Sequence, residues 1–174
     1  MDNTILDPYQ IRYTEHQERK KKILIEIMKD RHSDRMFSDL PVEQEKINQL
    51  VGVVGLCPSS CDRKAVSVMV IDDRDRKSLL GGILVGGVGW IHRASHILLI
   101  QADPIAYKAG NEIEFMPYID GGVVAQQLYL MATTLELSCC FVNPNIREMN
   151  QEHYHKIFGD KILIGAFAVG YKYE

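Results

Sequence analysis

The sequence predicts one domain that combines helices and strands, of the α+β or α/β class. The chain has 174 residues, which is the size of one ordinary domain. Stretches with the apolar spacing of helices alternate along it with short apolar stretches typical of strands. No internal repeat, low-complexity linker or change of composition divides the chain. We therefore assign residues 1–174 to a single domain.

The composition argues against several classes of partner. Hydrophobic residues make up 46% of the chain and charged residues 25%, an average globular balance. The formal net charge of -3 provides no basic surplus for nucleic acid or for an anionic membrane surface. The apolar stretches are too short to span a bilayer, and the polar start of the chain does not resemble a signal peptide. We expect a cytoplasmic protein that binds neither nucleic acid nor membrane.

The first part of the chain predicts two helices, a loop and a strand. Residues 1–13 are polar and are expected to form a flexible or partner-embracing tail. Apolar spacing predicts a helix over Thr14–Asp30. A second helix is predicted to begin at 39–43, where a proline and two acidic residues suit a first turn. The composition of Leu56–Lys64 is that of a loop, and Ala65–Ile71 is predicted to be a buried strand.

The second part continues the alternation after a charged and then glycine-rich region at 72–90. The predicted elements are a strand at Ile97–Gln101, a helix at Asp120–Leu137, a strand at Cys139–Val142, a helix at Ile146–Phe158 and a strand at Lys161–Tyr171. The helix at 120–137 is apolar on most of its circumference, so we expect it at the centre of the fold. A dimer partner is the simplest cover for such a helix, with its own sheet and neighbouring helices as the alternative.

Four cysteines raise the question of a metal site or a disulfide: Cys57, Cys61, Cys139 and Cys140. The first two are too widely spaced for the C-x-x-C arm that is usual in zinc sites. The last two are neighbours on a predicted strand, where successive side chains point to opposite faces. We expect free, buried thiols and no metal site.

The densest polar cluster is RHSDRMF at residues 31–37. Arg31 and Arg35 are four positions apart, with the hydroxyl of Ser33 between them. Such a set could hold a phosphate dianion through charge-assisted, forked hydrogen bonds. An arginine pair near the end of a basic helix is also common on solvated surface. The cluster alone leaves both interpretations open.

A series of segments in fixed order resembles the FMN-dependent nitroreductase family. RHSDRMF is followed by a proline-valine helix start and by PSSC at 58–61 ahead of a strand. Ala94-Ser95-His96 precedes an apolar strand, and the apolar helix at 120–137 leads into CCFV at 139–142. The last segment is IGAFAVGY at 164–171. Each segment is weak alone, whereas their order and spacing together are specific.

The resemblance implies both a fold and a function. The fold would be α+β, an α/β sandwich with a central, mostly antiparallel sheet flanked by helices, in an intertwined homodimer. The function would be that of an FMN-dependent oxidoreductase, passing hydride or electrons from NADH or NADPH to an electron-poor small-molecule acceptor. Two alternatives share the fold: a flavin-binding or interaction protein with little turnover, and a specialised flavin enzyme that acts on one biosynthetic metabolite or on reduced flavin.

The resemblance also implies three groups of FMN contacts. The phosphate and the polar edge of the flavin would be held by Arg31, His32 (mainly through its backbone), Ser33 and Arg35. The flavin ring bound chiefly to the other subunit would lie against Pro58, Ser59, Ser60 and Asp62. The reactive N5 edge would lie beside Phe141, Val142 and Asn143. Because the cofactor supplies the chemistry, no side chain is assigned a catalytic role.

The sequence departs from the family pattern at three places. Asp62 replaces an asparagine, and its carboxylate is expected to make the flavin harder to reduce unless Arg63 or Lys64 offsets the charge. Pro144 replaces a glycine that donates an amide near N5 in many members, and proline has no N–H. Lys172 is expected to stand alone for the basic tail that many members use on the phosphate. These departures predict slow reduction by nicotinamide.

Trp90 and Arg93 have no counterpart in the family motif. Trp90 is the only tryptophan and follows a glycine-rich stretch at 86–89. The two side chains could form part of a substrate pocket, with Arg93 binding an acidic group. They could equally be a core residue and a surface ion-pair partner.

Overall fold

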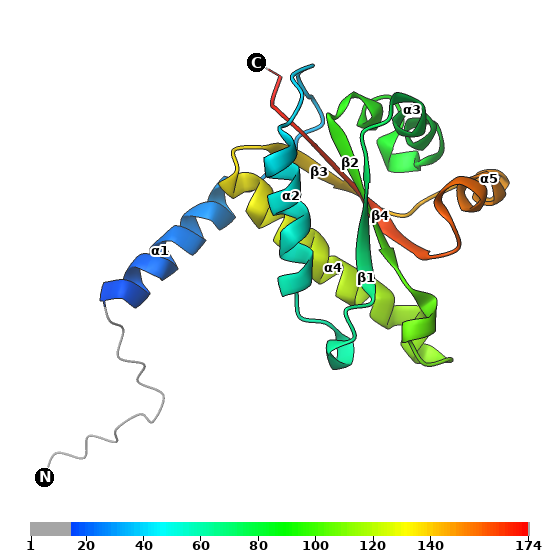
Figure 1. The fold of residues 1–174 in the computed structure, drawn as a ribbon, viewed down its shortest axis with the longest axis horizontal. Coiled ribbons are helices and arrows are strands. Elements are labelled where there is room, and N and C mark those ends of the chain that lie inside the picture. The colour runs from blue at the N-terminus through cyan, green and yellow to red at the C-terminus, as the bar shows by residue number, and fades with distance from the viewer. Residues whose placement is uncertain (1–14, 174) are drawn as a thin grey trace, which may run out of the picture.

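Four antiparallel strands form the middle layer of the fold (Figure 1). The computed structural model describes residues 15–173, so the predicted tail at 1–13 lies outside the described residues. The strands are β1 Val66–Ile71, β2 His96–Ala102, β3 Ser138–Val142 and β4 Ile162–Gly170. Their spatial order is β1-β2-β4-β3, and every neighbouring pair is antiparallel. The predicted α+β class and antiparallel sheet are confirmed.

Helices cover both faces of this sheet. They are α1 Glu15–Asp30, α2 Gln44–Gly52, α3 Arg74–Ile83, α4 Asn111–Thr134 and α5 Glu148–Phe158. Figure 1 shows α2 and α4 on one side of the sheet and α3 and α5 on the other, while α1 extends away from the body. Within the described residues, no helix combines the length and the apolarity needed to cross a membrane.

Strand β2 lies between β1 and β4, and every one of its residues is buried. Successive side chains of a strand point to opposite faces, so β2 contributes to two cores. Leu98 and Ile100 join the core under α2 and α4, whereas Ile97 and Leu99 join the core under α3 and α5. Each such side chain contributes about 2 kcal/mol through burial.

Three helices differ from the sequence prediction. Helix α4 begins at Asn111 rather than at Asp120. The sequence prediction missed its first turns because Pro117 lies inside the helix, and proline usually interrupts one. Helix α2 begins at Gln44, after the predicted start at 39–43; the N–H of Val42 donates to the hydroxyl of Ser95 instead. Helix α3 was not predicted at all.

Helix α3 is explained by its cap and its buried face. The carboxylate of Asp73 accepts from the backbone N–H of Arg76 at 2.8 Å, a standard N-cap contact. Leu80 and Ile83 are buried in the second core. The high charge at 72–77 and the glycines that follow concealed this helix in the sequence.

The cysteine prediction holds for three of the four thiols. Cys57, Cys139 and Cys140 are free and buried, but Cys61 is exposed, which corrects the prediction at that position. Cys61 lies in the loop before β1, outside both cores. Within residues 15–173, no group of three or more His, Cys, Asp or Glu side chains is placed to hold a metal ion.

Candidate functional site

The segment at 31–37 runs from the end of α1 to the ends of β3 and β4. The backbone N–H of Asp34 donates to the carbonyl of Cys139 at 2.9 Å. Phe37 is buried and forms an isolated antiparallel bridge with Lys172. These contacts fix the backbone of the segment, so its polar side chains emerge beside the edge strand β3.

Asp34 and His32 stabilise the segment from within. The Asp34 carboxylate accepts a 2.7 Å hydrogen bond from the hydroxyl of Ser138, and its oxygen lies 2.8 Å from His32 Nε2. The other ring nitrogen of His32 lies 2.7 Å from the carbonyl of Asp30. The imidazole of His32 is therefore engaged inside the segment.

The two arginines of the cluster lie on aromatic rings rather than on carboxylates. The guanidinium of Arg31 is 5.3 Å from the ring centre of Tyr129, and that of Arg35 is 5.9 Å from the ring centre of Trp90. Neither forms an ion pair with any residue in the 15–173 range. Their N–H groups are therefore available to an anion, and with the exposed hydroxyl of Ser33 they fit a phosphate.

Tyr129 connects the arginine cluster to strand β3, and the sequence analysis did not identify it. Its hydroxyl oxygen lies 2.9 Å from the hydroxyl of Ser33 and accepts the backbone N–H of Phe141 at 2.8 Å. Its ring packs edge-on against Phe167 in the core, with 5.0 Å between ring centres. One signal was available: a tyrosine within an otherwise apolar helix requires a partner for its hydroxyl.

Phe141, Val142 and Asn143 follow one another along and beyond β3. Phe141 lies over Gly165 of the neighbouring strand, where any side chain would overlap its ring. Val142 is buried, and its side chain belongs to the core under α3 and α5. The side-chain oxygen of Asn143 accepts from the backbone N–H of Asn145 at 3.3 Å.

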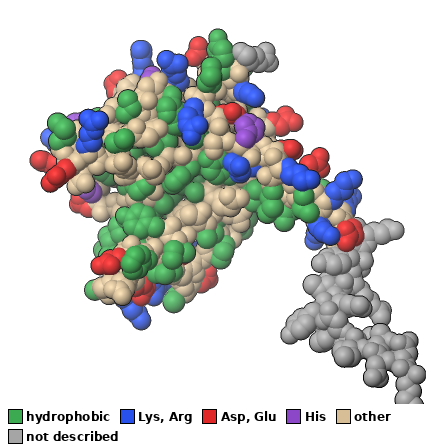
Figure 2. Space-filling model, turned by 180° about the vertical axis from the view of Figure 1, so that it is seen from behind, with side chains coloured by type: hydrophobic (Ala, Val, Ile, Leu, Met, Phe, Trp, Pro, Cys, Tyr) green, Lys and Arg blue, Asp and Glu red, His purple; other side chains and the backbone are tan. Residues whose placement is uncertain are grey.

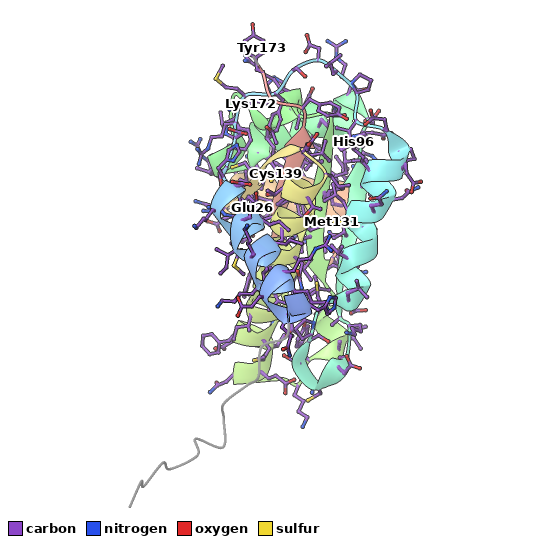
Figure 3. All side chains as sticks on the ribbon, turned by 90° about the vertical axis from the view of Figure 1, so that its left-hand side faces the viewer. Glu26, His96, Met131, Cys139, Lys172 and Tyr173 are labelled. Carbon is purple, nitrogen blue, oxygen red and sulfur yellow. The ribbon has the colours of Figure 1, made fainter. Side chains whose placement is uncertain are left out.

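Lys172 lies near the arginine cluster, at the end of β4. It lines a cavity of about 260 Å³ together with His32, Cys139, Glu136 and others. Figure 3 shows Lys172 and Cys139 toward the same end of the molecule. A basic side chain is thus available beside the cluster, although Glu136 and Asp30 line the same cavity and reduce its positive charge.

The loop before β1 has an unusual backbone. Cys61, Asp62 and Lys64 all have positive φ, at 50°, 54° and 52°. Non-glycine residues in this conformation cost about 1 kcal/mol or more each and persist where surrounding contacts hold them. Such strain is often found at ligand-binding loops.

Helix α4 holds the loop with two carboxylates. The buried Asp120 accepts from the backbone N–H of Ser60 at 2.9 Å, from its hydroxyl at 2.8 Å, and from the hydroxyl of Tyr107 at 3.0 Å. Glu112 forms an ion pair with Arg63. Burial and the bond to Asp120 raise the pKa of Tyr107 to about 12, so its hydroxyl stays protonated as a donor.

Lys64 offsets the charge of Asp62, as the sequence analysis had considered. Its ammonium lies 3.0 Å from the Asp62 carboxylate and also donates to the carbonyl of Cys57 at 2.6 Å. Arg63 faces Glu112 instead. The hydroxyl of Ser59 accepts from the backbone N–H of Lys64 at 2.9 Å, and Pro58 lies next to helix α4.

One chain does not bring the two predicted halves of the site together. Ser33 contacts Tyr129, whereas Ser60 contacts Asp120. Tyr129 and Asp120 both belong to α4 and are separated by about 14 Å along the helix axis, at a rise of about 1.5 Å per residue. The arginine cluster and the loop therefore lie toward opposite ends of α4 (Figure 1).

An apolar groove lies along α4 between these two ends. It has a volume of about 470 Å³, and its lining includes Met28 of α1, Pro58 of the loop, and Ile119 and Leu130 of α4. Figure 2 shows hydrophobic side chains on this protruding helix α1 and on the body of the molecule. On α4 itself, Phe115 is 59% exposed and Ile119 is 56% exposed, large values for such side chains.

Comparison with solved structures decides the fold. A nitroreductase family protein from Streptococcus pneumoniae matches with a TM-score of 0.75 over 86% of this chain and 90% of that chain, at 15% identity. Another, from Clostridium difficile, matches with a TM-score of 0.70 over 86% and 84%, at 22% identity. The chain has the nitroreductase fold. The fold expected for the single chain from the sequence resemblance is confirmed.

Two further comparisons bear on the ligand. A protein from Desulfovibrio desulfuricans, assigned as a nitroreductase and solved in complex with FMN, shares the nitroreductase fold with a TM-score of 0.75 over 87% of each chain, at 21% identity. In sequence, 80 residues are 36% identical to the FMN reductase [NAD(P)H] of Bacillus subtilis. That match covers 46% of this chain and 32% of the relative. No family model matches the sequence.

Trp90 lies under Arg35 of the arginine cluster in this nitroreductase-fold chain. The sequence analysis had considered it as part of a substrate pocket or as a core residue, and neither interpretation described this contact. Its ring stacks on that of Phe37 at 6.3 Å, and its indole N–H donates to the carbonyl of Gly86 at 2.9 Å. One side of the ring faces Arg35. Trp90 is half-buried and thus forms a platform for an arginine.

Proposed function

We propose that the chain is an FMN-dependent oxidoreductase of the nitroreductase family. It would take electrons from NADH or NADPH and pass them to an electron-poor small-molecule acceptor. The observation that carries this proposal is the set formed by Arg31, Ser33 and Arg35 on a nitroreductase fold. Two guanidinium groups without carboxylate partners in the described chain, and a hydroxyl between them, have the chemistry of a phosphate site.

The residues of the chain would act by binding and orientation. FMN, when bound, supplies the electron and hydride transfer itself. Arg31 and Arg35 would donate hydrogen bonds to the phosphate, and Lys172 would add charge nearby. The backbone of Phe141, Val142 and Asn143 would lie beside the flavin. No side chain needs to act as a nucleophile or as a general base. Burial raises the pKa of the Cys140 thiol, which keeps it neutral beside the cluster.

We further propose that two copies of this chain form the site together as a homodimer. The arginine cluster and the loop with Ser59, Ser60 and Asp62 lie toward opposite ends of α4 within one chain, with the open apolar groove between them. A second copy seated in the groove along α4 would bring its own loop to the first copy's cluster. It would also cover Ile119 and Phe115, which are exposed in the single chain. The proposal keeps the cytoplasmic location expected from the sequence.

A flavin-binding protein with little turnover is the second candidate. Pro144 favours it, because a proline beside β3 cannot donate a backbone N–H to the flavin. The charge of Asp62 no longer favours it, since Lys64 lies 3.0 Å away. The two candidates differ only in turnover, so binding and reduction need separate measurements.

The test is to add FMN to the purified protein and record the absorption spectrum and the dissociation constant. We expect tight FMN binding, and weaker binding of riboflavin because it lacks the phosphate. Arg31→Ala should weaken FMN binding by about 2 kcal/mol and change riboflavin binding little. Equal affinity for FMN and riboflavin in the parent protein would refute the phosphate site.

Anaerobic mixing of the flavin-loaded protein with NADH and with NADPH then separates the two candidates. Bleaching of the flavin absorption by either nicotinamide supports an oxidoreductase. Stable FMN binding without bleaching over many minutes would support the flavin-binding candidate instead.

A further inference from the structure

Tyr129 occupies a position between three parts of the proposed phosphate site. Its hydroxyl contacts the Ser33 hydroxyl at 2.9 Å and the backbone N–H of Phe141 at 2.8 Å. Its ring lies under the guanidinium of Arg31. The tyrosine comes from α4, whereas its partners come from the 31–37 segment and from β3. It therefore fixes the relative positions of two segments that are distant in sequence from it and from each other.

The direction of these hydrogen bonds follows from counting hydrogens. A backbone N–H can only donate, so the Tyr129 oxygen accepts from Phe141. The hydrogen of the Tyr129 hydroxyl then needs an acceptor of its own. The nearest oxygen is that of Ser33, and the remaining neighbour is the thiol of Cys140, whose sulfur is a weak acceptor.

The Ser33 hydroxyl is left with its own hydrogen available. If its oxygen accepts from Tyr129, its O–H cannot point back at Tyr129. The Cys140 sulfur, which both hydroxyls contact, is a weak acceptor, so an anionic oxygen at the exposed side is the stronger partner for this O–H. Ser33 is exposed, so this O–H can reach a ligand. Burial raises the pKa of Tyr129, which keeps the phenol protonated and preserves this direction at neutral pH.

We propose that Tyr129 is a positioning residue that orients the Ser33 hydroxyl as a donor toward an anionic group, the phosphate of FMN. This inference rests on the proposed function, because it assumes that the phosphate lies at Arg31 and Ser33. Tyr129 does not contact the flavin. It acts through Ser33, and its ring seats Arg31 beside that hydroxyl.

The experiment compares FMN and riboflavin binding in Tyr129→Phe. This change keeps the ring that packs on Phe167 and lies under Arg31, and removes only the hydroxyl. We expect FMN binding to weaken about fivefold to tenfold, the effect of one misdirected hydrogen bond to a charged group. Riboflavin binding should change less than about twofold, because riboflavin has no phosphate for Ser33 to contact.

Two further variants separate positioning from general destabilisation. Tyr154→Phe removes another buried hydroxyl, one bonded to Gln101 near α5, and should leave the ratio of FMN to riboflavin affinity unchanged. Ser33→Ala should lower that ratio by itself. In the double variant, Tyr129→Phe should lower it no further, because the ring under Arg31 is kept and the tyrosine hydroxyl acts on the phosphate only through the serine.

The outcomes distinguish this inference from the proposed function. If the parent protein does not prefer FMN to riboflavin, the proposed function fails and the inference fails with it. If the parent prefers FMN and folded Tyr129→Phe keeps the same ratio, only the inference about Tyr129 is overturned. Should Tyr129→Phe not fold, Ser33→Ala decides: an unchanged ratio there overturns the inference as well.

Discussion

Lys64 determines the charge of the loop that carries Asp62. The two side chains lie 3.0 Å apart, although the Asp62 side chain is 82% exposed. As a pair they are neutral overall, so the bound flavin should not be harder to reduce than beside the family's asparagine. The sequence interpretation of a slow enzyme therefore loses its electrostatic support.

The pair can be tested by changing each member. Asp62→Asn should raise the midpoint potential of bound FMN and Lys64→Met should lower it, each on the order of 0.5–1 kcal/mol for a unit charge near the ring. The double variant should return close to the parent value. Redox titration of the four proteins checks this. Identical potentials in all four would place the loop away from the flavin.

At the residue scale, the sequence predicted which polar side chains gather but not what orients them. Arg31, Ser33 and Arg35 were proposed as a phosphate site because charges and a hydroxyl at short spacing suggest phosphate chemistry. Tyr129 and the seat that Trp90 provides depend on contacts between segments far apart in the chain. No local pattern encodes such contacts.

At the scale of elements, the end of α4 contains a strained residue. Glu136 has φ of 58° just after the helix. The N–H of Leu137 donates to the carbonyl of Ala132 at 2.9 Å, which closes the helix and requires this conformation. A glycine adopts it without a steric cost.

We predict that Glu136→Gly raises the free energy of unfolding by about 0.5–1 kcal/mol, through relief of this strain. The loss of a negative charge at a helix C-terminus acts in the same direction. The matched control is Glu152→Gly in the interior of α5, which should lower the stability by a similar amount. Urea denaturation of both variants is the measurement. A loss of stability in Glu136→Gly comparable to that in Glu152→Gly would argue against strain at this cap.

The elements themselves were predicted well where one pattern dominated. All four strands were expected within a few residues of their bounds, because each is a short apolar run that the core requires. Helix α3 was missed because its buried residues, Leu80 and Ile83, are few and stand among charges and glycines. The early part of α4 was missed because Pro117 usually interrupts a helix.

At the scale of the whole molecule, several buried groups keep their protons at unusually high pH. Burial raises the pKa of Tyr154 and of the Cys139 thiol to about 12, as burial and Asp120 do for Tyr107. In the unfolded chain these groups ionise near their ordinary values of 10.0 for tyrosine and 9.0 for cysteine. When the pH rises above those ordinary pKa values, the unfolded chain binds fewer protons than the folded chain.

Stability should therefore be lost on the alkaline side. The free energy of unfolding should be unaffected by these groups below about pH 9, fall as pH rises, and level off above about pH 12. Each unit by which the pKa of a group in the folded chain exceeds its pKa in the unfolded chain corresponds to about 1.4 kcal/mol. Summed over the three groups, the loss of unfolding free energy is on the order of several kcal/mol. Urea denaturation at pH 8, 10 and 11 measures it, with Tyr154→Phe expected to show a shallower decline. A free energy that stays constant up to pH 11 would contradict the prediction.

The exposed apolar face of α4 leads to a prediction about assembly. Obligate dimers bury more than about 2,000 Å² of total surface. The groove between α1 and α4, with Met28 and Ile119 in its lining, is apolar and open, and we expect a second copy to cover it together with the surface around it. We expect sedimentation at micromolar concentration to give about twice the chain mass of 19.8 kDa.

A charge in the groove should abolish this assembly. Ile119→Asp would bury a carboxylate without a partner at the proposed interface, which costs several kcal/mol, so the chain should sediment as a monomer. It should also lose FMN binding, although Arg31 and Ser33 are unchanged, because the second copy's loop is then absent. Met149→Asp is the matched control, since Met149 is 82% exposed on α5, on the other side of the sheet. It should remain a dimer with bound FMN. A monomeric Ile119→Asp that binds FMN as tightly as the parent would show that one chain forms the whole site.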